Sequence, residues 1–201
     1  MMKQFRIQLK ISIILAVISI IVFGLIYPGI MTLVGQLIFP YQANGSIIRL
    51  HGKKIGSALI GQSFTQPDYF WSRPSATTPF PYNASNSSGS NLGPINPDLI
   101  RHVQLRVEVL KKANPNQKGP IPMDLVTSSA SGLDPDISPA AAQYQAARIA
   151  HVRHLSISAV QQLIQKYTQG RWLGIFGEPR VNVLELNLAL NQLSNTKNFK
   201  K

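Results

Sequence analysis

ISIILAVISIIVFGLIYPGIMTLVGQLIF, residues 11–39, is the stretch that decides the architecture, because it is long, apolar and free of charged side chains. A helix needs roughly 20 apolar residues to cross the ~30 Å hydrocarbon layer of a bilayer. Residues 11–31 supply that length, and the apolar run extends to residue 39. We therefore predict a transmembrane helix over residues 11–31.

A cleaved secretory signal is the alternative interpretation of this stretch. Such a signal has a basic start, an apolar region of about 7–15 residues and a small-x-small cleavage site. The basic start fits, but the apolar run is longer and no clean cleavage site follows it before Tyr41. The membrane anchor is favoured, and both interpretations deliver the rest of the chain across a membrane.

Positive charges flank the predicted helix on both sides: Lys3, Arg6 and Lys10 before it, and Arg49, Lys53 and Lys54 after it. The N-terminal charges lie closer to the bilayer, and a long following domain crosses largely regardless of its own charge. We predict a cytoplasmic basic tail at residues 1–10 and an extracytoplasmic domain at residues 41–201.

Small residues mark one face of the helix. Ser12 and Ala16 form a small-xxx-small pair with Ser19 near the same face, which lets another helix approach closely. These three are candidates for transmembrane packing. The absence of an ionisable residue within the span argues against an ion pathway through this helix.

The remaining domain is basic. Three of the 20 Lys and Arg residues precede the anchor, which leaves 17 against 8 acids and a net charge of +9. Because these residues are scattered rather than arranged in a stripe with aromatics, nucleic acid is not the expected partner. Contact with the membrane surface or with another subunit is favoured, and a merely solubilising charge is the alternative. The chain has no cysteine, so disulfides and thiolate chemistry are excluded.

Short strands and capped helices follow the anchor. Residues 47–50 and 57–61 indicate strands around a polar turn at 51–54, and residues 124–128 and 181–183 indicate two more. Helices are expected from Asn96-Pro97 to before Asn114, from Ser138-Pro139 to about His154, from Ser156 or Ser158 onward, and over residues 184–193. The expected fold class is α+β: one N-terminal transmembrane helix followed by a single mixed α/β domain.

Residues 65–96 lack any helical or strand period and are rich in Pro, Ser, Asn and Gly. Disorder would predict few aromatics, but this segment holds Tyr69, Phe70, Trp71, Phe80 and Tyr82. We expect an ordered loop packed by its rings that serves as a contact surface.

The residues offer little for catalysis. No phosphate-binding loop and no Gly-x-Ser-x-Gly elbow is present. His151 and His154 lie three apart on a predicted helix, but an exposed basic face is favoured over a metal site because no third ligand is evident. Asp134 and Asp136 fit a turn before the Ser138 cap better than acid–base or calcium chemistry. We assign no catalytic and no metal-binding residue.

Several long motifs in order resemble the C subunit of the Kdp-type potassium-transporting ATPase. They are residues 42–46 (QANGS), 56–62 (GSALIGQ), 69–77 (YFWSRPSAT), 81–83 (PYN), 90–94 (SNLGP), 96–97 (NP), 131–134 (SGLD), 137–139 (ISP), 181–183 (VNV) and 186–190 (LNLAL). The resemblance spans nearly the whole chain, anchor included. One departure is Ser87-Ser88-Gly89-Ser90, where the family usually has a Ser-Gly-Gly run.

The resemblance implies a single-pass subunit of an inner-membrane complex that hydrolyses ATP to import potassium. The implied partners are a P-type pump subunit, a channel-like potassium-binding subunit and the lipid bilayer. ATP and potassium are then handled by the complex, and no cofactor is assigned to this chain. Its missing Asp-Lys-Thr-Gly motif fits an accessory, non-catalytic role.

Two molecular roles are implied by the resemblance. One is a stabiliser that assists potassium uptake from the outer face, with Tyr69, Phe70, Trp71, Arg73 and Asn91 as candidate partner-binding residues. The other is a catalytic chaperone that raises the pump subunit's affinity for ATP, with Ser87, Ser88 and Gly89 as candidate nucleotide contacts. We favour the first, because a domain outside the membrane cannot reach cytoplasmic ATP.

A membrane-tethered envelope enzyme is a hypothesis of another class. It would need a constellation of His, Asp and Ser that the sequence does not display. Copurification discriminates between the two classes: a Kdp subunit leaves the membrane with two much larger partners, and an enzyme works alone.

Overall fold

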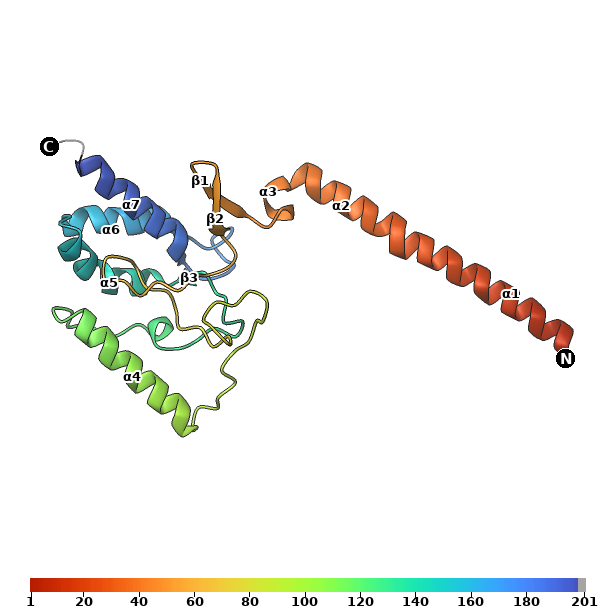
Figure 1. Ribbon diagram of the computed structural model, residues 1–201, viewed down its shortest axis with the longest axis horizontal. Helices are drawn as coiled ribbons and strands as arrows, with labels where there is room; N and C mark the ends of the chain where they lie inside the picture. Colours follow the sequence, from red (N-terminus) through yellow and green to blue (C-terminus); the bar gives the residue numbers. More distant parts are fainter. Residues whose placement is uncertain (199–201) are drawn as a thin grey trace. The chain divides into compact units, whose positions relative to one another are not determined.

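The computed structural model describes residues 1–198, which fall into two compact units with a boundary between Ile55 and Gly56. The first unit is dominated by one long helical stretch, Met2–Ile38 (Figure 1). It consists of α1 (Met2–Ser19), the π-helical segment η1 (Ile20–Ile26) and α2 (Tyr27–Ile38). The second unit is a helix and strand domain, which confirms the predicted α+β class with one N-terminal transmembrane helix.

The helical stretch is longer than the predicted span of residues 11–31. Its 37 residues have a most apolar window of mean hydropathy 2.8, and none of that window is buried within the chain. At 1.5 Å per residue the stretch is about 55 Å long, more than the ~30 Å of hydrocarbon. The helix begins at Met2, so the basic residues of the predicted tail lie on its first turns.

The π-helical segment η1 has a local cause. Pro28, two residues after its end, has no N–H and cannot donate to the carbonyl four residues earlier. The N–H of Tyr27 instead bonds the carbonyl of Val22, five residues back. Wider turns of this kind are one way in which a helix absorbs a proline.

A β-hairpin follows the short helix α3 (Pro40–Ala43). Strand β1 (Ile47–Leu50) pairs with β2 (Lys53–Ser57). The two residues between them, His51 and Gly52, both have positive φ, at 48° and 79°, as a tight two-residue hairpin turn requires. The second strand therefore starts at Lys53, and the expectation of a strand at residues 57–61 was wrong.

Three helix starts follow the sequence expectation. Helices α4 (Pro97–Ala113), α5 (Pro139–Val152) and α6 (Ile157–Tyr167) are N-capped by the side chains of Asn96, Ser138 and Ser156. Each cap oxygen accepts a backbone N–H of the first turn that would otherwise lack a partner. The last helix, α7 (Val183–Asn198), begins near the expected position and continues further.

A small antiparallel sheet connects these helices. Its order is β3 (Asp136–Ile137), β5 (Arg180–Asn182) and β4 (Thr168–Gln169), with Ile137 and Thr168 both paired to Val181. Val181 is fully buried at the centre of the sheet. Helix α6 packs against both α5 and α7, and Figure 1 shows α4 on the other side of this unit.

Residues 124–128 were expected to form a strand and do not. The 3₁₀ helix η2 (Met123–Leu125) occupies this place. Leu125 and Val126 are both buried, and adjacent buried residues do not fit the in–out alternation of a strand with one solvated face. The core contains side chains from α4 to α7 and the sheet together with Phe70 of the long loop.

Candidate docking site

Two buried amide side chains fix the backbone of the loop at residues 65–96. Asn187 of α7 accepts the N–H of Phe70 at 2.9 Å and donates to its carbonyl at 3.0 Å. Gln145 of α5 accepts the N–H of Trp71 at 2.7 Å and donates to its carbonyl at 3.2 Å. Both amides therefore pair with a loop residue as a neighbouring strand would. The loop is an ordered surface attached to two helices.

Arg148 of α5 completes this attachment. Its guanidinium donates to the carbonyls of Pro67 and Tyr69, and also to Gln145 Oε1 at 2.7 Å. It also lies 4.6 Å from the centre of the Trp71 ring. Burial lowers the pKa of Arg148 to about 10, so the side chain is still charged at neutral pH. Among the described residues no carboxylate forms an ion pair with Arg148, so this buried cation is compensated mainly by oxygen dipoles and an aromatic face.

The candidate partner-binding residues have different surroundings. Phe70 is fully buried and packs in the core, so it offers no surface. Tyr69 and Trp71 are half-buried, and the Arg153 guanidinium lies 4.7 Å from the centre of the Tyr69 ring. Asn91 is exposed, with a positive φ of 49°. Partner contact stays a prediction for these residues.

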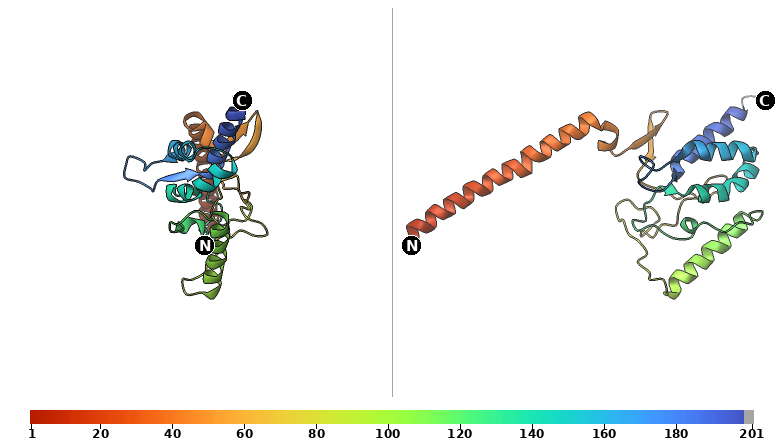
Figure 2. Two further views of the ribbon diagram at one scale, coloured as in Figure 1. Left: turned by 90° about the vertical axis from the view of Figure 1, so that its left-hand side faces the viewer. Right: turned by 180° about the vertical axis from the view of Figure 1, so that it is seen from behind.

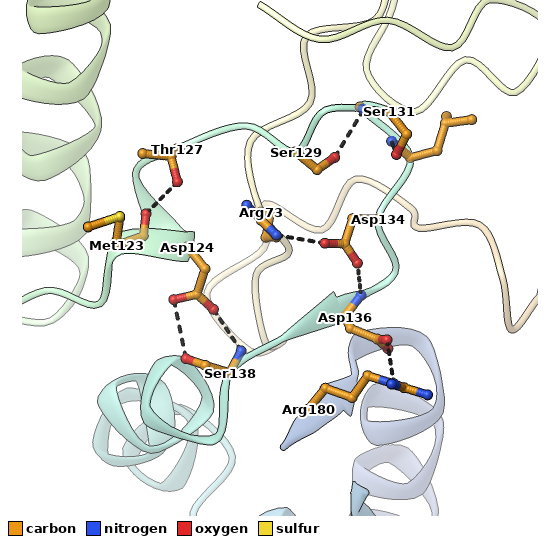
Figure 3. Close-up of polar contacts among 12 residues, drawn as sticks. Arg73, Met123, Asp124, Thr127, Ser129, Ser131, Asp134, Asp136, Ser138 and Arg180 are labelled. Carbon is orange, nitrogen blue, oxygen red and sulfur yellow. Dashed lines mark hydrogen bonds and ion pairs between the residues drawn. The ribbon is translucent and has the colours of Figure 1, made fainter. Parts of the chain in front are cut away.

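Arg73 belongs to a network of ion pairs at the edge of the loop (Figure 3). Its Nη1 lies 2.6 Å from Asp134 Oδ2, and the other carboxylate oxygen accepts the N–H of Asp136 at 3.0 Å. Asp136 in turn pairs with Arg180 at 3.0 Å. The side chain of Arg73 is 23% exposed, so most of this candidate partner-binding residue is buried within the chain. Its Nε is buried and lacks a hydrogen-bond partner among the described residues.

Both acids of the Asp134–Asp136 turn are consequently engaged within the chain. Burial raises the pKa of the Asp136 carboxyl, and the nearby Arg180 charge opposes that shift. A third acid, Asp124, accepts the N–H of Ser138 at 2.7 Å and faces its hydroxyl at 3.2 Å. These carboxylates secure the start of α5 (Figure 3). All three carboxylates thus bind groups of the same chain, which indicates a structural role.

An apolar cavity of about 450 Å³ lies between the loop and α4. Trp71, Arg73 and Tyr82 line it from the loop, and Leu105 and Val109 line it from the helix. The Tyr82 hydroxyl donates to the carbonyl of Arg73 at 2.6 Å, and burial raises its pKa to about 12. More than half of the Leu105 and Val109 side-chain surface is exposed. The lining is mostly apolar and includes the charged side chains of Arg73 and Arg106, a combination that protein interfaces commonly have.

The candidate nucleotide residues pack against the segment at 129–132. Ser87 and Ser88 donate their hydroxyls to the carbonyls of Ser131 and Ala76, and the N–H of Ser88 also bonds to Ser131. A Cβ at Gly89 would lie 2.7 Å from the carbonyl oxygen of Ala130, so the glycine permits close backbone packing. These donors already have partners in the chain.

The paired histidines do not share a helix face. Helix α5 ends at Val152, and His154 follows it with a positive φ of 53°. Sequence reasoning missed Gln145, Arg148 and Asn187, which position the loop. The available signal was their polarity among apolar helical neighbours, as in Leu186-Asn187-Leu188.

The long apolar helix and the α+β domain define a protein of the single-pass membrane class. Comparison with known protein families identifies the family to which the chain belongs. The model for the K+-transporting ATPase, c chain, matches residues 9–192. The chain belongs to this family.

Curated relatives agree with that assignment. The potassium-transporting ATPase KdpC subunit of Herpetosiphon aurantiacus is 57% identical over 182 residues, which cover 89% of this chain and 94% of the relative. The subunit of Methylococcus capsulatus is 55% identical over 184 residues, covering 92% and 97%. That of Burkholderia ambifaria is 56% identical over 179 residues, covering 89% and 93%.

Proposed function

We propose that this chain is the accessory, non-catalytic subunit of a high-affinity, ATP-driven potassium import complex. In this proposal its domain docks on the outer face of the channel-like potassium-binding subunit and stabilises the assembly with the pump subunit. The carrying observation is the family match over residues 9–192. The loop geometry supports docking, because Gln145, Asn187 and Arg148 hold the loop in one fixed shape. A preorganised surface loses less entropy when it binds.

The proposed orientation places the N-terminus in the cytoplasm and the second unit outside. Lys3, Arg6 and Lys10 support it, since positive charges close to a helix end are retained inside. The cysteine-free sequence makes a direct test simple. In right-side-out vesicles, a single cysteine at exposed Ser85 reports on which side of the membrane the second unit lies. A matched single cysteine at exposed Gln4 does the same for the N-terminus.

A membrane-impermeant maleimide should label Ser85→Cys from outside, and it should label Gln4→Cys only after the membrane is opened. The opposite pattern would place the domain on the ATP side and overturn the proposal. It would favour the catalytic-chaperone role, which needs access to cytoplasmic ATP. In the present structure the donors of Ser87 and Ser88 are engaged within the chain, which weighs against that role.

Docking is tested by copurification. The exposed residues Leu105 and Val109 line the apolar cavity, so Leu105→Ser with Val109→Ser should weaken recovery of the two larger subunits while the chain stays folded. Leu59→Ser, at a similarly exposed leucine outside the cavity, is the matched control. Undiminished recovery with the double variant would show that this surface is not the docking site.

A further inference from the structure

A loop at residues 171–178 carries a dense group of exposed apolar side chains, which we name the apolar knob. Trp172, Leu173, Ile175 and Phe176 are 69%, 71%, 73% and 58% exposed. Figure 2, left, shows this light-blue segment projecting from the body of the second unit. Four large apolar residues exposed within five positions are unusual for a surface that only faces water.

The knob is preformed by its own contacts. Trp172 and Phe176 exchange two backbone hydrogen bonds of 2.8 and 3.0 Å, and their rings lie 5.7 Å apart. Arg171 Nη2 lies 2.8 Å from both carboxylate oxygens of Glu178, which closes the base of the loop. Gly174 adopts a positive φ of 75° at the turn. The side chains are thus presented by a fixed backbone.

This backbone is also suited to an apolar environment. The N–H groups of Trp172, Gly174, Ile175 and Phe176 all donate to carbonyls within the loop. A bilayer offers no water to replace missing hydrogen bonds, so a segment that enters it must satisfy its polar groups internally. The knob satisfies four of its N–H groups before any partner arrives.

We propose that the apolar knob inserts into the boundary between headgroups and acyl chains of the bilayer that holds this chain's own helix. The tether keeps the second unit at a high local concentration of lipid surface. Tryptophan and phenylalanine favour that boundary. The flanking Arg171 and Arg180 are paired with Glu178 and Asp136, but residues 41–201 as a whole carry a net charge of +9, which is complementary to anionic headgroups. The knob exposes on the order of several hundred Å², short of the ~800 Å² that each side of a stable protein interface buries.

Fluorescence of Trp172 tests this proposal. The full chain is reconstituted in nanodiscs of phosphatidylcholine with or without phosphatidylglycerol, and the signal of a Trp172→Phe chain is subtracted to remove Trp71. The Trp172 component should be blue-shifted and quenched at least twofold by brominated acyl chains. It should resist iodide in the aqueous phase. Phosphatidylglycerol should strengthen the quenching by brominated lipid.

Polar substitution of the tip provides the matched comparison. Leu173→Asn with Ile175→Asn should return the Trp172 emission toward the red and remove most of the quenching by brominated lipid. Leu59→Asn, at a leucine 62% exposed elsewhere in the same unit, should leave both unchanged. Circular dichroism of each variant establishes that the fold is kept, which is expected because these side chains face outward.

Two outcomes would overturn the proposal. Quenching of Trp172 by iodide but not by brominated lipid would show that the knob stays in water. Protection from both quenchers only within the complete transport complex would show that a partner subunit covers it. Neither outcome depends on the maleimide experiment above, so failure of lipid insertion is distinguishable from failure of the proposed function.

Discussion

Arg148 contacts three residues of the long loop, Pro67, Tyr69 and Trp71. It is 7% exposed and supplies donors to Asn114 Oδ1, Gln145 Oε1 and the carbonyls of Pro67 and Tyr69. Arg148→Met keeps much of the aliphatic volume but removes every donor. Because buried acceptors are then left unpaired, we expect a loss of about 3 kcal/mol of unfolding free energy.

Urea unfolding of the chain in detergent, followed by near-ultraviolet circular dichroism, measures this loss. The control is Arg101→Met, which removes an exposed arginine whose ion pair with Asp98 spans 3.1 Å. Exposed pairs of this kind contribute at most about 1 kcal/mol, so the control should change little. Equal losses for the two variants would contradict the role assigned to Arg148.

Asp136 provides a prediction on pH. Burial raises the pKa of its carboxyl in the folded chain above the ordinary value of 3.8. A raised pKa means that folding disfavours the charged form, so this group costs stability once the pH exceeds the unfolded-state value and charge develops. The cost is absent well below 3.8 and complete above the folded-state pKa.

Asp136→Asn removes that cost. The stability of the variant relative to the parent should therefore rise as the pH increases from about 3 to 7. Urea midpoints at a series of pH values check this trend, with Asp98→Asn at an exposed position as the control. A relative stability that falls with rising pH would mean that the Arg180 pairing outweighs burial.

Close backbone packing decides how two loop elements fit together. The segment at 129–132 supports residues 87–89, and Gly132 at its end faces Ser88 with a positive φ of 67°. A Cβ there would lie 2.5 Å from the carbonyl oxygen of Ser88 and 2.7 Å from Thr77 Cγ2. Gly132→Ala should therefore cost at least about 2 kcal/mol, through strain and displacement of the loop.

Thermal unfolding and limited proteolysis of the loop check this prediction. Gly119→Ala is the matched control, because a Cβ at Gly119 meets nothing within 4 Å. That change should be within about 1 kcal/mol of neutral. Unchanged protease sensitivity of Gly132→Ala would show that the two segments do not depend on this contact.

Elements whose determinants lie close together in the sequence were predicted, and elements that depend on distant residues were missed. Asn96 and Ser138 were predicted as caps, and the third cap was narrowed to Ser156 or Ser158, because a cap and the N–H it accepts lie within three residues. The two-residue strands β3 and β4 were missed, since they are too short for any alternation to be visible. Their pairing with β5 is a tertiary effect.

The candidate site also has a local feature that was predicted from the sequence and long-range contacts that were not. The aromatic content of residues 65–96 predicted an ordered loop, and that order is confirmed. The groups that position it lie far along the chain: Gln145 is 74 residues from Trp71, and Asn187 is 117 residues from Phe70. Nothing local encodes such pairs, so their identity needed the structure. The burial of Phe70 beside half-buried Tyr69 and Trp71 likewise depends on the helices it meets.

At the scale of the whole molecule, the proposed function gives the helix and the domain separate roles in assembly. The chain forms two compact units, and the candidate docking residues all belong to the second. Linking a docking domain to the membrane of its partner makes binding effectively intramolecular. Such a link commonly raises affinity by about 10²–10⁴ without any new contact. We expect the chain without residues 1–40 to stay folded but to bind the other subunits weaker by that factor.

Binding titrations on the transport complex reconstituted without this subunit measure the loss. Fusion of residues 41–201 to an unrelated transmembrane helix separates the tether from specific helix packing. If tethering is the main contribution, the fusion recovers most of the affinity. The affinity that the fusion does not recover then measures the contacts of the Ser12, Ala16 and Ser19 face. Ala16→Leu in the native helix should lower the affinity by that same amount, because a larger side chain prevents close helix approach. Equal affinity with and without the helix would contradict the tethering role and leave docking to the domain alone.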